Sequence, residues 1–325
     1  MTAIDLAKIQ KILVISTTHI GDTVLTTPVI SVLRERFPSS YISVMVGPNA
    51  AALFEGSRTV NEVFAYDKKA TWFEKFKFVL KLRKQQFDLV VDLRNTAIPI
   101  LISARHYNSL FLDRSAISMR EKHLKQLRFL FPIDGSYENK FDFFTEEEQA
   151  RALRRLPASA ANNFLIIAPG AGSDLKRWTI SGFVEVMNYF LRKNKAVVLI
   201  GWERERSLGM ELERMVSKPV TNLIGALALR ESAGLISRAS LVVANDSAVM
   251  HLAHELNRPT VSIFGPTDPK KYSQMGENRR MVRLNLDCSP CEVAQCRLER
   301  RICLDDLPPS SVIQASEELL NHAAN

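Results

Sequence analysis

Short apolar runs rich in β-branched residues alternate with longer amphipathic segments along the whole chain. Eight runs have the length of strands: residues 11–16, 41–46, 60–65, 89–92, 164–168, 196–200, 241–244 and 260–264. Most are apolar on both faces, which is typical of central parallel strands with helices on either side. The segments between them place apolar residues at helical spacing, as at positions 24–33 and 183–191. This alternation predicts an α/β fold of two doubly wound domains.

The boundary between the two domains is predicted near Pro157. Residues 145–156 have the pattern of a helix with an acidic first turn, and residues 156–163 have the composition of a loop. The predicted domains are therefore 1–157 and 158–325. A last helix is expected after Pro308 and Pro309, with a serine as its cap, and it is a candidate to pack back on the first domain.

The composition is that of a globular protein and excludes several classes. The 325 residues are 46% hydrophobic and 24% charged, unlike a disordered, collagen-like or low-complexity chain. The length suits two domains better than one core. The apolar runs are far shorter than the roughly 20 residues that cross a bilayer. The N-terminus has no export-signal pattern, so we expect a cytoplasmic protein.

The net charge of +8 predicts an acidic partner, which is nucleic acid, an anionic membrane surface, a nucleotide or a phosphorylated glycolipid. Part of the excess is local. Residues 68–84 contain seven Lys and Arg residues against the single carboxylate of Glu74, with phenylalanines interleaved. This run is either a solvated helix face or a patch for an anionic acceptor or membrane surface.

The first motif with candidate chemistry is STTHIGDT at residues 16–23, where the first strand ends and a helix begins. Ligands bind at the carboxyl ends of the strands in doubly wound sheets. Gly21 permits a tight turn, and Asp22 would face that ligand-binding edge, although a helix cap is the simpler role for an aspartate here. The chain has neither the G-x-G-x-x-G fingerprint of dinucleotide binding nor a Walker-type phosphate loop.

The second motif is PGAGSDLKRW at residues 169–178, after the first strand of the second domain. Gly170 and Gly172 would let backbone amides approach an anion, and Lys176 would add a point charge to a phosphate. A flexible glycine loop followed by a solvated basic pair is the alternative.

The third motif is ANDSAVMH at residues 244–251, where another strand ends and a helix starts. The amides from Asp246 to Val249, which include those of Ser247 and Ala248, would form a cradle for a diphosphate, with His251 one turn inside the helix. Plain capping, and a buried histidine that only packs, are the alternatives.

Four cysteines lie close together near the end of the chain, at Cys288, Cys291, Cys296 and Cys303. Four thiols could hold zinc or an iron–sulfur cluster. Their spacing matches no standard finger and no histidine is near, so free or reversibly paired thiols remain the alternative.

Taken together, these motifs resemble the bacterial heptosyltransferases (glycosyltransferase family nine), which build the inner core of lipopolysaccharide. The matching stretches are ISTTHIGDTVLTTPVISVLRERFP, PGAGSDLKRW, VVANDSAVMHLAHELNRPTVSIFGPTDP and CSPCEVAQC. The resemblance implies a GT-B architecture, with two Rossmann-like domains facing across a cleft. It also implies an ADP-heptose donor on the second domain and a lipid A–Kdo or heptosylated core acceptor against the first.

The resemblance also implies roles for individual residues. Asp22 corresponds to the catalytic base, and Lys176 to the lysine that contacts the donor phosphate. Glu205 corresponds to the acidic residue that contacts the ribose. The segment with Asp246, Ser247, Ala248 and His251 would wrap the diphosphate and sugar. Family members commonly have glycine where this chain has Ala248, and a positive φ there would be strained.

The implied reaction is an inverting, metal-independent transfer without a cofactor, by an enzyme that is peripheral on the inner face of the cytoplasmic membrane and has no nucleic-acid partner. Two other classes stay open. One is a non-catalytic nucleotide- or anion-binding protein on the same scaffold. The other is a nicotinamide-dependent oxidoreductase, against which the missing glycine fingerprint argues.

Overall fold

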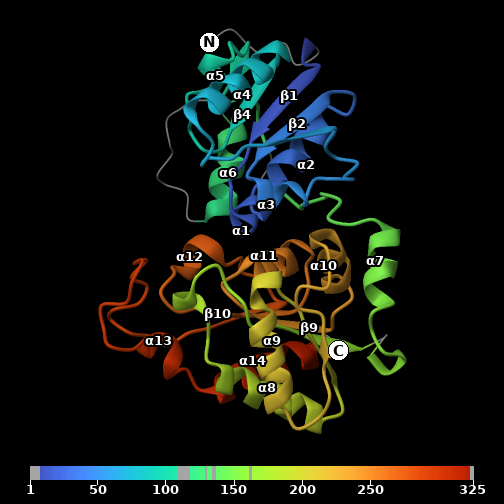
Figure 1. The fold of residues 1–325 in the computed structure, drawn as a ribbon, viewed down its shortest axis with the longest axis vertical. Helices are drawn as coiled ribbons and strands as arrows, with labels where there is room; N and C mark the ends of the chain where they lie inside the picture. Colours follow the sequence, from blue (N-terminus) through green and yellow to red (C-terminus); the bar gives the residue numbers. More distant parts are fainter. Residues whose placement is uncertain (1–7, 109–117, 129, 134–136, 161–162, 323–325) are drawn as a thin grey trace. The chain divides into compact units, whose positions relative to one another are not determined.

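The computed structural model describes residues 8–108, 118–128, 130–133, 137–160 and 163–322. The contacts between residues divide the chain into two compact units, Met1–Phe143 and Phe144–Asn325. Each unit is built around one parallel sheet (Figure 1).

The first unit has a sheet of five parallel strands in the order β3-β2-β1-β4-β5. The strands are β1 (Lys11–Ile15), β2 (Tyr41–Val46), β3 (Glu62–Ala65), β4 (Leu89–Asp92) and β5 (His106–Tyr107). The helices are α1 (Ile20–Val24), α2 (Thr27–Arg36), α3 (Pro48–Ala51), α4 (Trp72–Lys84), α5 (Ile98–Leu101) and α6 (Met119–Arg128). The central strand β1 pairs Ile12 with Ile42 on one side and with Leu89 on the other.

The second unit has a sheet of six parallel strands in the order β11-β10-β9-β6-β7-β8. The strands are β6 (Phe164–Ala168), β7 (Ala196–Leu199), β8 (Thr221–Asn222), β9 (Leu241–Asn245), β10 (Thr260–Ile263) and β11 (Arg279–Val282). The helices are α7 (Glu146–Leu153), α8 (Ile180–Arg192), α9 (Arg206–Met215), α10 (Leu229–Ile236), α11 (Ala248–Glu255), α12 (Pro269–Tyr272), α13 (Ile302–Asp305) and α14 (Pro309–His322). Short 3₁₀ turns lie at Ala158–Ala160, Asp174–Lys176 and Glu203–Glu205.

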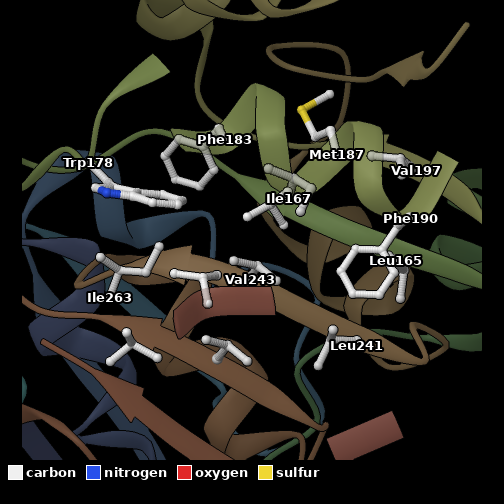
Figure 2. Packing of buried hydrophobic residues seen from close by; sticks show 14 of the residues in the cluster. Leu165, Ile167, Trp178, Phe183, Met187, Phe190, Val197, Leu241, Val243 and Ile263 are labelled. Carbon is white, nitrogen blue, oxygen red and sulfur yellow. The ribbon is translucent and has the colours of Figure 1, made fainter. Parts of the chain in front are cut away.

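The core of the second unit lies between its sheet and the helices α8 and α14. Figure 2 shows aromatic side chains from the loop after β6 and from α8 packed against strand residues such as Val243 and Ile263. Trp178 and Phe183 meet edge to face, with ring centroids 5.1 Å apart. A Cβ on Gly182 would lie 2.5 Å from the Trp178 ring, so the glycine makes room for this pair. The same packing fixes one end of the loop that follows β6.

The strand pattern in the sequence is confirmed for the interior of both sheets. All eight predicted strands are present, with ends that differ by at most two residues. Strands β5, β8 and β11 were not predicted. They are two to four residues long and form sheet edges, where incomplete burial leaves no continuous apolar run.

The apolar stripe at 24–33 does not form one continuous helix. The chain turns between α1 and α2, where the Thr26 hydroxyl donates to Thr23 O at 2.7 Å and the Thr27 hydroxyl donates to Val24 O at 2.7 Å. Pro28 in the first turn of α2 suits a new helix start. Threonine side chains that bond back to the chain compete in this way with a continuous helix.

The division between the units falls before α7, upstream of the predicted boundary at Pro157. Helix α7 packs on α10 of the second unit: Arg230 Nε lies 3.0 Å from a Glu148 carboxylate oxygen, and Gln149 Nε2 donates to Ser237 Oγ at 2.7 Å. Gly234 allows this approach, because a Cβ there would lie 2.8 Å from Gln149 Cα. A local loop signal could not show which core the preceding helix joins.

The terminal helix was a candidate to pack on the first domain, and the structure places it in the second. Helix α14 packs on α8 and on strands β9 to β11. Its buried residues Val312 and Leu319 belong to the core of the second unit, and Glu317 pairs with Lys193 at 3.1 Å.

Candidate functional site

The turn after β1 is held by hydroxyl groups of the first motif. Ser16 Oγ lies 2.6 Å from Thr26 Oγ1, and Thr17 Oγ1 lies 2.9 Å from Thr23 Oγ1. Gly47 lies against the same turn, since a Cβ there would be 2.7 Å from Thr18 O. These contacts fix the backbone from which α1 projects.

Asp22 lies in the first turn of α1 and is half-buried. The N-cap position is His19, so Asp22 does not serve as the helix cap that was the simpler expectation. Gly21 precedes it as an ordinary helical residue without a positive φ. The carboxylate of Asp22 is thus presented from a short helix at the carboxyl edge of the first sheet.

His123 is a neighbour of Asp22 that the sequence did not indicate. It is 2% exposed, and its Nδ1 donates to Leu25 O at 3.2 Å. Burial lowers the pKa of His123 to about 4, although the bond to Leu25 and the negative charge of Asp22 act in the opposite direction. The ring is therefore neutral at pH 7, and the bond to Leu25 places its proton on Nδ1.

In the second unit, Asn245 holds the loop of the second motif. Its side chain is fully buried at the end of β9. The amide nitrogen donates to Pro169 O at 2.8 Å, and the amide oxygen accepts from the backbone N–H of Trp178 at 3.0 Å. One side chain thus joins both ends of the loop to the neighbouring strand. The signal in the sequence is a polar residue that ends an otherwise apolar strand.

Lys176, Asp246 and His251, which come from the second and third motifs, lie together at this edge. Lys176 Nζ lies 2.8 Å from Asp246 Oδ2, and His251 Nε2 lies 3.8 Å from Asp246 Oδ1. Asp246 and His251 are buried, whereas the Lys176 side chain keeps 30% of its surface. The ammonium group also lies 5.5 Å from the centroid of the Tyr272 ring. A partly accessible cation is therefore held in place by a buried carboxylate.

Helix α11 begins at Ala248, directly behind this ion pair, with Ser247 at the N-cap. Its first intrahelical bond runs from the His251 N–H to Ser247 O at 3.2 Å, so the preceding amides have no partner within the helix. Ser247 Oγ is buried and, among the described residues, has no hydrogen-bond partner. Ala248 is helical and not at positive φ, so the strain that its replacement of glycine implied does not arise.

Glu205 packs beneath the glycine loop. It is 6% exposed, and its Oε2 accepts from the Trp202 N–H at 2.8 Å. Oε1 accepts no hydrogen bond in the described part of the chain, although Arg204 Nε lies 3.8 Å away. Burial raises the pKa of Glu205. A buried carboxylate oxygen without a donor is ready to bind a hydroxyl group of a ligand.

The two loop glycines differ in what surrounds them. A Cβ on Gly170 would lie 2.1 Å from the Glu205 carboxylate, so only glycine fits above that side chain. Gly172 has nothing within 4 Å of a Cβ position, and its φ is not positive. Only Gly170 is therefore required by the surrounding packing.

The four cysteines are free thiols. Cys288 and Cys291 are exposed, and Cys296 and Cys303 are half-buried. Burial raises the pKa of the Cys303 thiol. In the described part of the chain, no group of three or more His, Cys, Asp or Glu residues is arranged to hold a metal ion.

The structure thus groups Lys176, Asp246, Ser247 and His251, and it places Glu205 under the same glycine loop. Asp22 belongs to the first unit. Comparison with known proteins adds that the family described as glycosyltransferase family 9 (heptosyltransferase) matches residues 75–302. The chain belongs to glycosyltransferase family 9.

Relatives named as heptosyltransferases agree with this assignment over nearly the whole chain. Lipooligosaccharide heptosyltransferase 2 of Campylobacter jejuni subsp. jejuni serotype O:2 is 27% identical over 97% of this chain and 99% of its own. Lipopolysaccharide heptosyltransferase 3 of Escherichia coli K12 is 26% identical over 92% and 95%. The structure of E. coli ADP-heptose lps heptosyltransferase II has a TM-score of 0.80 at 23% identity, over 97% of this chain and all of its own.

This family 9 member is therefore a glycosyltransferase with the GT-B fold of two Rossmann-like domains. The family and the fold predicted from the motifs are confirmed. Among the described residues, no helix is both long and apolar enough to span a bilayer.

The burial of His123 predicts a pH dependence of stability. The pKa of His123 is lowered from 6.5 to about 4. The neutral ring therefore contributes fully to the free energy of unfolding above pH 6.5, and this contribution is lost as the pH falls toward 4. The shift corresponds to about 3 kcal/mol of unfolding free energy. In His123→Asn, the amide can still donate to Leu25 O but does not titrate. The free energy of unfolding should therefore fall less between pH 7 and pH 4 than it does in the wild type, by about 3 kcal/mol.

Urea unfolding at a series of pH values measures this difference. The partly exposed His106→Asn is the matched control and should follow the wild-type curve. Parallel curves for His123→Asn and wild type would show that His123 is not held neutral by the fold.

The two loop glycines provide a matched test of the packing on Glu205. Gly170→Ala places a methyl group on the Glu205 carboxylate and should lower the free energy of unfolding by about 1–3 kcal/mol. Gly172→Ala enters open space and should stay within about 0.5 kcal/mol of wild type. Chemical denaturation of both variants measures the difference. Equal stabilities would mean that the loop does not lie on Glu205 as described.

Proposed function

We propose that this glycosyltransferase moves a heptose from ADP-heptose to the inner core of lipopolysaccharide, with inversion at the anomeric carbon. The observation that carries the proposal is the Lys176–Asp246 ion pair in front of the start of α11. Relatives of the chain are named as lipooligosaccharide and lipopolysaccharide heptosyltransferases. A solved neighbour with a TM-score of 0.72 is described as the E. coli heptosyltransferase WaaC with ADP.

The donor diphosphate would bind at the start of α11. Amides that precede the first intrahelical bond point out of a helix N-terminus and attract negative charge. Lys176 adds a positive charge, and the buried Asp246 keeps its ammonium group in place. The free Ser247 hydroxyl can donate to a phosphate oxygen. His251 Nε2 lies 3.8 Å from Asp246 Oδ1.

Glu205 would bind the ribose of the donor. A ribose hydroxyl can donate to Oε1, the buried oxygen that accepts no hydrogen bond. The contact would compensate for the burial of that oxygen. Gly170 supports this role indirectly, since it leaves room for the carboxylate under the loop.

Asp22 would act as the general base. Its carboxylate takes the proton of an acceptor hydroxyl as that oxygen attacks the anomeric carbon, and ADP leaves with the electron pair of the broken bond. The transition state has oxocarbenium-ion character, as in glycoside hydrolysis. Negative charge grows on the departing diphosphate, where Lys176 and the helix amides meet it. The proposal therefore needs no divalent ion and no cofactor.

The acceptor would be lipid A–Kdo or a heptosylated core, which is anchored in the inner leaflet of the cytoplasmic membrane. The protein would then work in the cytoplasm as a peripheral enzyme. The net charge of +8 suits an acceptor and a surface that are both anionic.

Replacement of the base tests the reaction. Asp22→Asn should lower kcat by about 10²–10⁴-fold, measured as ADP release with ADP-heptose and acceptor. The Kd for ADP should stay within about threefold of wild type, because the proposed donor residues belong to the other unit. A kcat close to wild type would exclude Asp22 as the base. Absence of ADP release from the wild-type protein would favour a nucleotide-binding protein without transferase activity.

Neighbouring cations provide a matched test of the phosphate site. Lys176→Met should raise the Kd for ADP by about tenfold or more, since it removes a charge-assisted bond to the diphosphate. Arg177→Met is the control, because Arg177 pairs with the exposed Asp174 and not with Asp246. Isothermal titration with ADP measures both variants. An equal loss in both would show a diffuse charge effect in place of a defined contact.

A further inference from the structure

Helix α4 presents an apolar stripe away from the core of the first unit. Trp72, Phe73, Phe76 and Leu80 are 79%, 50%, 54% and 40% exposed. At about 100° per residue, these four positions fall within an arc of about 100° on the helix. Leu82 on the opposite side is fully buried. The core therefore does not account for the aromatic side chains of the outer stripe.

The helix is a well-formed element that holds this stripe in place. Thr71 and Glu74 form a reciprocal capping box at its start. The rings of Trp72 and Phe73 meet edge to face at 5.9 Å, and Lys77 Nζ lies 4.4 Å from the centroid of the Phe73 ring. Exposed aromatic residues on a capped helix form a stable surface that does not depend on a loop.

A neighbouring helix extends the apolar surface. Helix α5 packs beside α4, and both lie at the same end of the first unit (Figure 1). Ile100 and Leu101 of α5 are 55% and 52% exposed. We call the six residues the α4–α5 surface: Trp72, Phe73, Phe76, Leu80, Ile100 and Leu101.

Unpaired positive charge surrounds this surface. Seven cations lie on α4 and on the turn before it: Lys68, Lys69, Lys75, Lys77, Lys81, Arg83 and Lys84. Within the described residues, no carboxylate lies within ion-pair distance of any of them. Glu74, the acidic residue of this segment, has its carboxylate engaged in the helix cap. Apolar residues with cations around them complement a partner surface that is both hydrophobic and negatively charged.

We propose that the α4–α5 surface docks on the anionic lipid bilayer, with Trp72, Phe73 and Phe76 inserted among the headgroups and the surrounding lysines on lipid phosphates. A helix with Trp, Phe and Leu on one side and Lys and Arg around them is the type that lies in a membrane interface. An apolar contact with a second protein chain would not need the many cations around the α4–α5 surface, whereas binding to anionic lipid headgroups would. The inference rests on the proposed function for its role, which is to bring the enzyme to a lipid-anchored acceptor.

Vesicle binding by the full-length protein tests the proposal. Flotation with phosphatidylglycerol–phosphatidylcholine vesicles should recover the wild type, and pure phosphatidylcholine vesicles should recover about tenfold less, because the lysines require anionic lipid. High salt should release the protein. Trp72→Ser/Phe73→Ser/Phe76→Ser should bind the anionic vesicles at least about tenfold more weakly.

A matched variant controls for the loss of exposed apolar area. Met210, Met215 and Met275 in the second unit are also 48–85% exposed. The triple variant Met210→Ser/Met215→Ser/Met275→Ser should bind anionic vesicles like the wild type. Tryptophan emission should shift to the blue on binding. Trp72→Phe should remove most of this shift, since Trp178 is buried and the half-buried Trp202 belongs to the second unit.

Three outcomes would overturn the proposal: no binding of the wild type to anionic vesicles, equal binding to neutral vesicles, or unchanged binding of the aromatic triple variant. Loss of self-association in that variant without loss of vesicle binding would assign the surface to a second copy of the chain. Turnover separates this inference from the proposed reaction. With a delipidated, water-soluble acceptor, the aromatic triple variant should keep the wild-type kcat/KM, and with acceptor in vesicles it should lose activity. A wild-type protein that binds vesicles but releases no ADP would refute the reaction and not the docking.

Discussion

The parallel order of the second sheet is the constraint on which the donor-side site depends. Strands β10, β9, β6 and β7 are consecutive neighbours and run in the same direction, so their carboxyl ends lie at one edge. The loops that follow them are far apart in the sequence, yet they must emerge side by side. Lys176, Glu205, Asp246 and Ser247 all belong to these loops. Their grouping is a consequence of strand order more than of any contact between the side chains.

Buried polar groups then set the geometry within that edge. Asn245 has partners on both sides, which joins the glycine loop to β9 and places Lys176 beside Asp246. Ser247 Oγ and Glu205 Oε1, by contrast, are buried with no hydrogen-bond partner in the described part of the protein. Buried polar atoms without a partner are costly, and a ligand that binds them recovers part of that cost. These two atoms therefore support the proposed binding of a polar ligand at this edge.

In the first unit, the notable side chains are exposed or half-buried, whereas those of the second unit are mostly buried polar groups. Helix α4 contributes Leu82 to the core and leaves an aromatic stripe uncovered on its other side. Asp22 is half-buried at the end of the same sheet, next to a histidine that the fold holds neutral. The proposed general base therefore lies beside a ring that carries no positive charge at pH 7.

The sequence alone determined the edge strand β3 and all the interior strands of both sheets, the positions of the three loop motifs and the family. These features are local: strand and helix periodicities, glycine and cap residues, and short motifs all lie within windows of a few residues. Tertiary structure decided the rest. It broke the stripe at 24–33 into α1 and α2, attached α7 and α14 to the second unit, and formed the short edge strands. It also buried His123 against Leu25 O and gave Asn245 its two partners. These outcomes depend on contacts between residues far apart in the chain, whose energies are set by packing and burial and leave no periodic trace in the sequence.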